Sequence, residues 1–261
     1  MMIIIDEGEG DESMKKLEGK IAVVTGGSEG IGFGTARRFL AEGAKVVIAG
    51  RRQAELDRAV GALGPGASAV RADVSKLGDL DALYAAVKER HGRIDVLVAN
   101  AGVGKFTPLG AITEEEYDYQ FDVNVKGTVF TVQKALPLLV DGASIILLGS
   151  TTGVKGAVGT SVYGATKAAI RNLARSWVLD LKERKIRVNV LSPGPVRTPG
   201  LDGVFPSGQV DAVLAQFRER MPIGRIGDID ELGKAAVFLA SDDSSFVTGA
   251  ELFADGGFAQ V

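Results

Sequence analysis

Thr25-Gly26-Gly27-Ser28-Glu29-Gly30-Ile31-Gly32 is the stretch that decides the fold of this chain. It ends the apolar run 21–25 and opens an amphipathic segment over 30–42. Glycines at 26, 30 and 32 allow a sharp turn and a close backbone approach to a pyrophosphate, and a helix start adds free N–H groups and a positive dipole end. Three glycines also suit a tight turn that binds nothing, but their place between a strand and a helix favours a dinucleotide site.

Outward from this turn, the chain alternates between short apolar runs and longer amphipathic segments. The apolar runs lie at 21–25, 45–49, 67–72, 94–99, 144–149, 186–191 and 250–254, and amphipathic segments include 77–91, 117–139, 162–183 and 229–241. Continuous apolar runs are typical of strands buried on both faces, and strand–helix–strand alternation implies parallel pairing. We therefore predict an α/β fold, a single-domain Rossmann-type doubly wound parallel sheet of about seven strands with helices on both faces.

Two segments differ from this alternation. Residues 1–16 are charged and aperiodic, which predicts a flexible acidic tail before a single domain over 17–261, and Met14 could be the natural start. Residues 193–221 hold four prolines and four glycines. Long irregular segments in compact domains are often functional, so the apolar side chains of Leu201, Val204 and Phe205 predict a lid near 195–221.

The composition limits the classes of function. Apolar residues make up 46% and charged residues 24% of the 261 residues, a globular mixture, and 30 Lys and Arg against 33 Asp and Glu give no basic excess for nucleic acid. The absence of cysteine excludes disulfides, zinc–thiolate sites and thiol catalysis. No His, Asp or Glu cluster suggests a metal. The chain begins without a cationic, apolar signal sequence and has no apolar run near the ~20 residues of a membrane span, so we expect a cytoplasmic protein.

Several motifs, in order along the chain, resemble those of the short-chain dehydrogenase/reductase family, in its compact single-domain branch. The resemblance runs from about Leu17 to Phe258 and implies a nicotinamide-dependent oxidoreductase. The matching positions are T-G-x-x-x-G-x-G at 25–32, Asn100-Ala101-Gly102, Asn124, Ser150, and the pair Tyr163 and Lys167.

The pair Tyr163 and Lys167 has the spacing i and i+4, which places both side chains on one face of a helix. A phenol has a reference pKa of about 10, and a nearby cation lowers that pKa towards the range useful for general acid–base catalysis. Ser150 ends the fifth apolar run, where its hydroxyl can donate a hydrogen bond to a substrate oxygen. The resemblance implies Asn124, Ser150, Tyr163 and Lys167 as the catalytic set, with Asn124 holding a water that links Lys167 to solvent.

The second apolar run ends in Gly50-Arg51-Arg52, without the carboxylate that would bind a ribose 2′-hydroxyl and repel a 2′-phosphate. Arginine binds phosphate through charge-assisted hydrogen bonds, and a merely solvated pair would be unfavourable at a helix start. We predict NADP(H), with Arg51 as the main contact and Arg52 as support, and NAD(H) as a secondary cofactor. Glu29 argues the other way, because some NADP-using relatives carry a basic residue there.

The resemblance implies further cofactor contacts. Asp73 matches a residue that bonds adenine, but a cap for the following helix, with Ser75 as a rival, is equally open. Asn100 either supports the cofactor or forms a structural hydrogen bond between strands. Val196 and Thr198 are implied at the carboxamide, and Lys167 at the nicotinamide ribose. The full set of predicted cofactor contacts is Gly26, Ser28, Glu29, Gly30, Ile31, Gly32, Arg51, Arg52, Asp73, Val74, Asn100, Ala101, Gly102, Tyr163, Lys167, Pro193, Gly194, Val196 and Thr198.

A small, mostly apolar pocket is predicted for the substrate. We therefore predict hydride transfer between the nicotinamide and a small, mostly apolar carbonyl or secondary alcohol, with Tyr163 as the general acid–base. The predicted pocket residues are Ser150, Thr152, Val154, Tyr163, Gly194, Leu201 and Phe205.

Two other functions stay open. A 3-oxoacyl-carrier-protein-type reductase would need a basic docking patch, for which Arg171, Arg175, Lys182, Arg184 and Lys185 are available. A non-catalytic NADPH-binding regulator would not need the catalytic set. An enoyl reductase is disfavoured because its tyrosine and lysine lie further apart. The family is commonly tetrameric, so the resemblance implies a homotetramer.

Overall fold

The computed structural model describes residues 15–202 and 208–261, and in this part of the chain seven parallel strands form one sheet. The strand order β3-β2-β1-β4-β5-β6-β7 reverses between β1 and β4, which opens a crevice at the carboxyl ends of those strands. This confirms the predicted doubly wound sheet. The strands are β1 Ile21–Thr25, β2 Lys45–Gly50, β3 Ala67–Arg71, β4 Ile94–Ala99, β5 Leu139–Leu148, β6 Arg187–Pro193 and β7 Glu251–Ala254.

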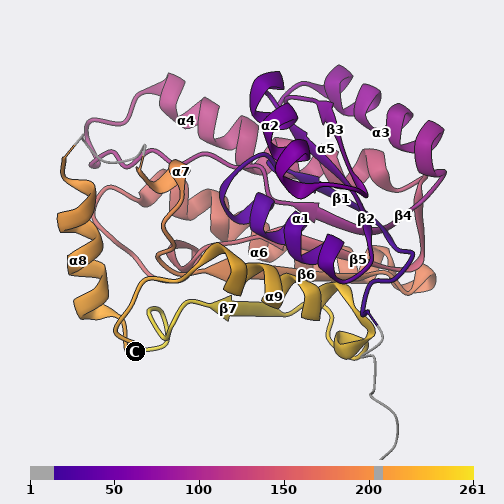
Figure 1. Cartoon of the computed structure of the whole chain (residues 1–261). Coiled ribbons are helices and arrows are strands. Elements are labelled where there is room, and N and C mark those ends of the chain that lie inside the picture. The colour runs from indigo at the N-terminus through magenta and orange to yellow at the C-terminus, as the bar shows by residue number, and fades with distance from the viewer. Residues whose placement is uncertain (1–14, 203–207) are drawn as a thin grey trace, which may run out of the picture.

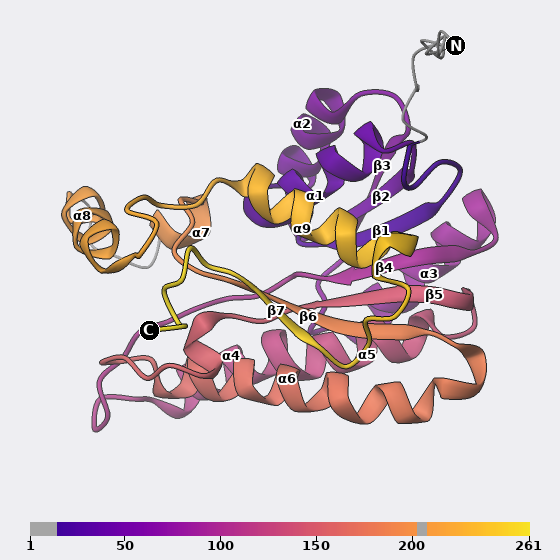
Figure 2. The same cartoon turned by 90° about the horizontal axis from the view of Figure 1, so that it is seen from below.

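Helices cover both faces of the sheet, and each face has its own buried core (Figures 1 and 2). Phe39 and Leu56 pack on one face, whereas Leu83 and Ile170 pack on the other. The helices over the first face are α1 Gly30–Ala41, α2 Gln53–Leu63 and α9 Ile229–Ala240. Those over the second are α3 Leu77–His91, α5 Gly127–Ala135 and α6 Ser161–Asp180.

The segment expected as one helix over 117–139 is interrupted. Helix α4 spans Glu114–Phe121, begins at the cap Thr113, and leads through the π-helical turn η1 (Asp122–Lys126) into α5. Strand β5 begins at Leu139, five residues before the predicted apolar run, because the main chain of Leu139 already pairs with Ile94. The π-helical turn inserts one extra residue into the helix, and such turns are frequent at functional sites.

The region predicted as an irregular lid contains two helices. Helix α7 spans Pro199–Asp202 and α8 spans Val210–Arg220, and both lie at the same end of the molecule, on the left in Figures 1 and 2. Within α8, Leu214 is the buried residue, and Val210, Val213, Leu214 and Phe217 recur at helical spacing, a signal that the prediction of an irregular lid overlooked. Val204 and Phe205 of the predicted lid lie outside the described residues.

The last residue of the predicted tail, Lys16, is bound to the folded domain. Lys16 donates its main-chain N–H to a Glu42 carboxylate oxygen at 3.1 Å and forms an ion pair with Asp243. The folded domain therefore includes Lys16, which the sequence analysis placed in the tail. The rest of that tail up to Met14 lies outside the described residues.

Candidate active site

The glycine loop between β1 and α1 forms a cradle lined by backbone. Gly26 and Gly30 have φ of 64° and 58°, in the left-handed region that favours glycine. A β-carbon on Gly32 would lie under 3.0 Å from the Gly26 carbonyl oxygen and the Asn100 amide. Glu29, the N-cap of α1, makes no side-chain capping bond, so the first N–H groups of α1 remain available to an anion. These features fit the pyrophosphate of a dinucleotide.

Because Gly32 has no room for a side chain, Gly32→Ala is expected to destabilise the protein by about 1–3 kcal/mol. The free energy of unfolding in a denaturant titration measures this loss. Gly78→Ala on α3 is the matched control: a β-carbon there meets nothing within 4 Å, and alanine suits a helix better. The control should be neutral or stabilising by up to ~1 kcal/mol. Equal stability of the two variants would contradict the packing argument.

Asn100 ties the end of β4 to the glycine loop. Its amide nitrogen donates to the main-chain oxygens of Thr25 and Gly26 at 2.8 and 3.1 Å. The Thr25 hydroxyl oxygen in turn accepts the main-chain N–H groups of Asn100 and Ala101, both at 3.1 Å. Of the two roles expected for Asn100, the structure therefore shows the structural hydrogen bonds between strands.

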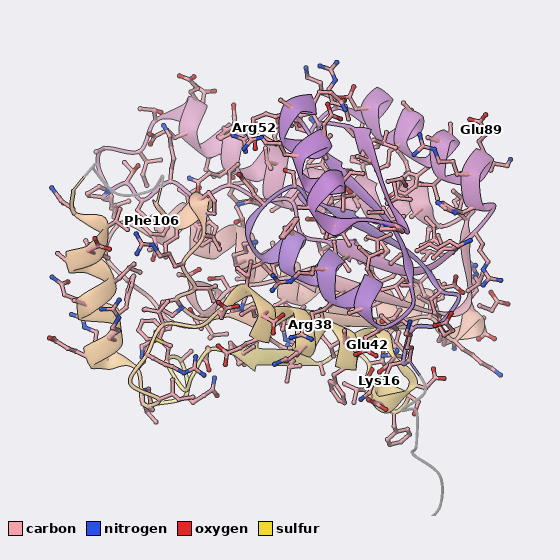
Figure 3. The ribbon with its side chains drawn as sticks, in the orientation of Figure 1. Lys16, Arg38, Glu42, Arg52, Glu89 and Phe106 are labelled. Atoms are coloured by element: carbon pink, nitrogen blue, oxygen red, sulfur yellow. The ribbon has the colours of Figure 1, made fainter. Side chains whose placement is uncertain are left out.

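The end of β2 carries two arginines with different partners. Arg52 forms an ion pair with Glu29 at 2.8 Å, and Figure 3 shows Arg52 beside α2. Arg51 instead donates to the Tyr119 hydroxyl of α4 at 3.2 Å. The Arg52 side chain thus offsets the negative charge of Glu29, and the hydrogen bond to Tyr119 raises the pKa of Arg51.

Neither candidate for the cap of α3 acts as one. The N-cap of α3 is Lys76, which makes no side-chain capping bond. Asp73 accepts hydrogen bonds from the Ser75 N–H at 3.0 Å and the Ser75 hydroxyl at 2.7 Å, so its carboxylate closes a local turn. The pKa of Arg51 is raised mainly by its hydrogen bond to Tyr119 and to a smaller extent by the charge of Asp73. Asp73 therefore lies near enough to Arg51 to act on its charge.

The segment after β6 faces the glycine loop. Thr198 accepts the Leu201 N–H at 3.1 Å at the start of α7, and a β-carbon on Gly30 would lie 3.4 Å from Thr198. Val196 is only 5% exposed and packs in the core beneath α1 and α9. Thr198 is therefore the side chain of this segment that lies near the predicted phosphate site.

Ser150, Tyr163 and Lys167 come together at the carboxyl end of β5. A side-chain hydrogen bond joins Ser150 to Tyr163, and Ser150 also accepts the Thr152 hydroxyl at 2.9 Å. The Lys167 ammonium donates to the Leu148 carbonyl at 2.8 Å and lies 5.6 Å from the centroid of the Tyr163 ring. The predicted hydroxyl, phenol and ammonium thus form one cluster.

Asn124 reaches this cluster from the π-turn η1. Its side-chain oxygen accepts the Val103 N–H, and its amide donates to the Val103 carbonyl, both at 2.8 Å, and to the Thr166 hydroxyl at 3.1 Å. A β-carbon on Gly102 would lie 3.3 Å from Asn124 Oδ1 and 3.6 Å from Lys167 Nζ. The Asn-Ala-Gly motif therefore passes directly beside Asn124 and Lys167.

The pKa of Tyr163 is shifted in the direction opposite to the one expected from its spacing to Lys167. Burial raises the pKa of Tyr163, and the hydrogen bond with Ser150 offsets only part of that rise. Burial also lowers the pKa of Lys167 to about 8. Desolvation thus dominates the pKa of the phenol, contrary to the lowered pKa that the spacing predicts.

Aromatic and glycine residues that the sequence analysis did not select lie against Tyr163. The Phe106 ring lies 5.8 Å from the Tyr163 ring, and a β-carbon on Gly104 would lie 3.6 Å from the same ring. Figure 3 shows Phe106 at the end of the molecule that carries α7 and α8. No sequence motif marks these positions, because they follow from the path of the loop after β4.

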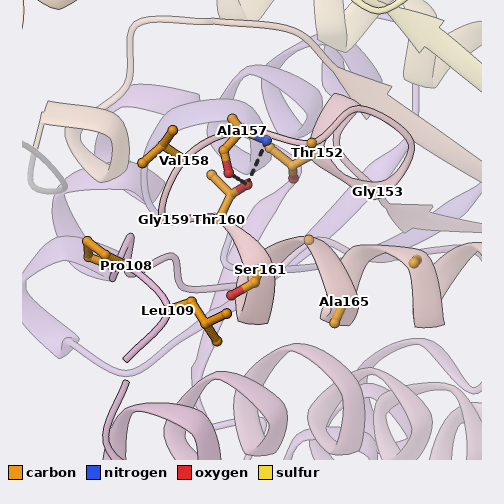
Figure 4. A pocket seen from close by; sticks show the side chains of 13 residues that line it. Pro108, Leu109, Thr152, Gly153, Ala157, Val158, Gly159, Thr160, Ser161 and Ala165 are labelled. Carbon is orange, nitrogen blue, oxygen red and sulfur yellow. Dashed lines mark hydrogen bonds between the residues drawn. The ribbon is translucent and has the colours of Figure 1, made fainter. Parts of the chain in front are cut away.

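The predicted pocket residues occupy different environments. Thr152 bonds Ser150, as described above, and Gly194 packs so tightly that a β-carbon would lie 2.7 Å from Asp255 Cα. Val154 is 58% exposed, and Phe205 lies outside the described residues. A pocket of about 600 Å³ lies between the 152–161 segment, α6 and the Pro108-Leu109 turn (Figure 4). Thr152 and Gly153 line it together with Gly164, Ala165 and Ala168 of α6.

Among residues 15–202 and 208–261, no group of three His, Asp or Glu side chains could hold a metal ion. In the same part of the chain no helix is long and apolar enough to cross a membrane.

Comparisons with known proteins agree with this geometry. A family model described as enoyl-(acyl carrier protein) reductase matches residues 26–259. Oxidoreductase asL5 of Sarocladium schorii is 51% identical over 251 residues, covering 95% of this chain and 99% of that protein. A solved short-chain dehydrogenase/reductase of Brucella melitensis, titled glucose/ribitol dehydrogenase, superposes with a TM-score of 0.88 at 30% identity, over 93% of this chain and 98% of that one. The chain belongs to the short-chain dehydrogenase/reductase family.

Other members of the short-chain dehydrogenase/reductase family are similar over the same span. Galactitol 2-dehydrogenase of Agrobacterium fabrum is 37% identical, covering 93% of this chain and 98% of that protein. A 3-ketoacyl-(acyl-carrier-protein) reductase of Brucella melitensis, complexed with NADH, has a TM-score of 0.87 at 36% identity, over 93% of this chain and 99% of that one. The protein is therefore an oxidoreductase of this family, which binds a nicotinamide cofactor.

Proposed function

We propose that this protein is an NADP(H)-dependent oxidoreductase that interconverts a small, mostly apolar carbonyl compound and its secondary alcohol. The observation that carries the proposal is the cluster at the end of β5, in which Ser150 bonds Tyr163 and Lys167 lies one helical turn further along α6. When bound, the nicotinamide supplies the hydride for reduction and accepts it for oxidation.

Each polar side chain of the cluster has a distinct task. Ser150 donates a hydrogen bond to the carbonyl oxygen and polarises it as negative charge develops. Tyr163 donates the proton to that oxygen, and the resulting phenolate is stabilised by the Lys167 charge. In the reverse direction the phenolate removes the hydroxyl proton. Asn124, through its bonds to Val103 and Thr166, holds the π-turn beside Lys167, and we assign it the ordered water that connects this lysine to solvent.

The pKa of Lys167 predicts how reduction depends on pH. Because burial lowers this pKa to about 8, the ammonium is charged below pH 8 and loses its proton as the pH rises through 8. The neutral amine no longer stabilises the phenolate left by proton donation. We expect kcat/KM for reduction to be constant at low pH and to fall about tenfold per pH unit above 8. Initial rates between about pH 6 and pH 10 measure this, and a flat profile across the range would contradict the role of Lys167.

The choice of NADP(H) rests on Arg51. Its guanidinium is held by Tyr119 at the end of β2, where a ribose 2′-phosphate would lie, and Arg52 neutralises Glu29. Because Arg52 pairs with Glu29, the negative charge of Glu29 argues less strongly against the binding of a 2′-phosphate. NAD(H) remains the secondary cofactor in this proposal, and a relative of known structure is complexed with NADH.

Reduction of an acyl chain on a carrier protein is the second candidate, supported by the similarity to a 3-ketoacyl-(acyl-carrier-protein) reductase. A basic docking patch would be needed, but three of its five candidate residues have partners, one of them Lys182, which pairs with Glu183 at 3.6 Å. Arg171 donates to the Gly249 carbonyl at 2.9 Å, and Arg184 to the Leu136 carbonyl at 2.9 Å. The remaining candidates make a weaker patch, so a free carbonyl compound is the preferred substrate.

The proposal is tested by the oxidation of NADPH and, separately, of NADH in the presence of a panel of small ketones and aldehydes. We expect turnover with NADPH at a higher kcat/KM than with NADH. Turnover with NADH alone would support the oxidoreductase activity but contradict the assignment of NADP(H) as the cofactor. Tight NADPH binding without turnover of any member, including acyl-carrier-protein thioesters, would favour the non-catalytic regulator.

We further propose a cytoplasmic homotetramer. Large apolar side chains are exposed near α6 and β7, including Leu179 at 69% and Phe246 at 102%, which supports contacts between copies over these elements. Light scattering at micromolar concentration should return four times the mass of the 27.2 kDa chain, and a monomer mass would remove the proposal.

A further inference from the structure

The segment after β7, residues Asp255–Val261, is folded into a compact turn against the predicted substrate pocket. The buried carboxylate of Asp255 accepts the N–H groups of Gly257 and Ala259, both at 2.9 Å. Gly194 donates its N–H to the Ala254 carbonyl at 3.2 Å. The turn is therefore fixed to the end of the sheet, next to a residue of the predicted pocket.

One side of this turn holds the loop that follows Ser150. The Lys155 ammonium donates to the main-chain oxygens of Phe258 and Val261 at 2.7 and 3.0 Å and lies 5.0 Å from the centroid of the Phe258 ring. The neighbours of Lys155 in this loop, from Val154 to Val158, are exposed. The far end of the loop has its own bond, from the Thr107 N–H to the Gly159 carbonyl at 2.8 Å. Lys155 is thus the anchor of the near end.

The other side of the turn holds helix α8. The Phe217 ring of α8 meets the Phe258 ring edge to face, with centroids 5.8 Å apart and an interplanar angle of 89°. Just beyond α8, Ile223 donates its N–H to the Gly256 carbonyl at 3.2 Å. Figure 1 shows the C-terminus beside the lower end of α8. Phe258 therefore contacts both the Ser150 loop, through Lys155, and the helix of the predicted lid.

We propose that Lys155 and Phe258 form a clamp that sets the spacing between the Ser150 loop and α8, and thereby selects substrates by size. The inference rests on the proposed function, because it takes the carbonyl substrate to enter between these two elements. Lys155 acts as a positioning residue. The loop that it anchors carries Thr152 and Val154 of the predicted pocket, so movement of the loop alters the pocket wall while Ser150, Tyr163 and Lys167 keep their places.

Lys155→Met tests the clamp because it keeps the aliphatic stem but removes the three N–H donors and the charge. We expect KM for the carbonyl substrate to rise about tenfold, with kcat within about threefold of the wild type. The ratio of kcat/KM for small substrates to kcat/KM for bulky substrates should fall. Lys155→Arg, which restores the charge and donors, should recover most of the wild-type KM. The matched control is Lys88→Met, because Lys88 is an exposed residue of α3 outside the predicted site.

Hydrogen exchange without substrate tests the clamp independently of turnover. Lys155→Met should exchange faster than wild type over 151–160, and Phe258→Ala should exchange faster over both 151–160 and 210–220. Unchanged exchange in both variants would overturn the clamp even if the enzyme proves active. Faster exchange with an unchanged KM and unchanged size preference would overturn its role in selectivity. Absence of turnover in the wild type would remove the proposed function, while the exchange data would still decide whether the clamp exists.

Discussion

Tyr163→Phe is expected to lower kcat for carbonyl reduction by about 10²–10⁴-fold, because it removes only the hydroxyl that donates the proton. The ring itself should remain packed against Phe106 and beside Gly104. The Kd for NADPH should therefore stay within about threefold of the wild-type value. Steady-state kinetics give kcat, and titration of NADPH fluorescence gives Kd.

Tyr117→Phe is the matched control for this experiment. Tyr117 is a 45% exposed tyrosine of α4 whose ring stacks on Phe121 with centroids 4.5 Å apart, a contact that phenylalanine preserves. This variant should keep the wild-type kcat. If Tyr163→Phe retained more than about a tenth of the activity, another group would have to donate the proton, and the assignment of Tyr163 would be wrong.

Arg51→Ala is the second substitution with a large expected effect. A hydrogen bond to a charged group contributes about 1.5–3 kcal/mol, so loss of the Arg51–phosphate contact should reduce kcat/KM for NADPH roughly 10- to 100-fold. NADH has no 2′-phosphate, so its kcat/KM should change by less than about threefold. The ratio of the two kcat/KM values is the quantity to measure.

Arg58→Ala provides the comparison on the adjoining helix α2. Arg58 lies on α2 with a 72% exposed side chain and pairs with Glu55, away from the end of β2. Its substitution should leave the NADPH to NADH ratio unchanged. An unchanged ratio in Arg51→Ala as well would show that cofactor choice is made elsewhere, with Arg52 the first residue to examine.

The sheet could be predicted because its strands are buried on both faces and so form continuous apolar runs. β1 and β4 were placed at their observed bounds, Ile21–Thr25 and Ile94–Ala99. Helix α8 was missed although Val210, Val213, Leu214 and Phe217 have the spacing of a helical face, because the prolines and glycines before it led to an irregular interpretation of the whole segment 193–221. The π-turn at Asp122–Lys126 was equally invisible, because its extra residue is stabilised by tertiary contacts of Asn124 and not by a local sequence signal.

The candidate site was predicted where its residues follow fixed spacings. Tyr163 and Lys167 share a helix, and the glycine loop occupies a single turn, so local geometry alone brings these groups together. The bonds Arg51–Tyr119 and Lys155–Phe258 join positions 68 and 103 residues apart, and no spacing rule reaches that far. The direction of the Tyr163 pKa also depends on burial, which becomes known only when the surrounding elements are in place.

The most direct test of hydride transfer to a carbonyl carbon is the fate of deuterium from NADPH that carries deuterium at both hydrogen positions of the nicotinamide C4. Mass spectrometry and NMR of the product locate the label. The proposal predicts one deuterium on the carbon that bears the new hydroxyl group, formed by the wild type and not by Tyr163→Phe. A product with deuterium on the β-carbon of a saturated C–C bond would instead identify the enzyme as an enoyl reductase, and a product without deuterium would contradict hydride transfer from NADPH.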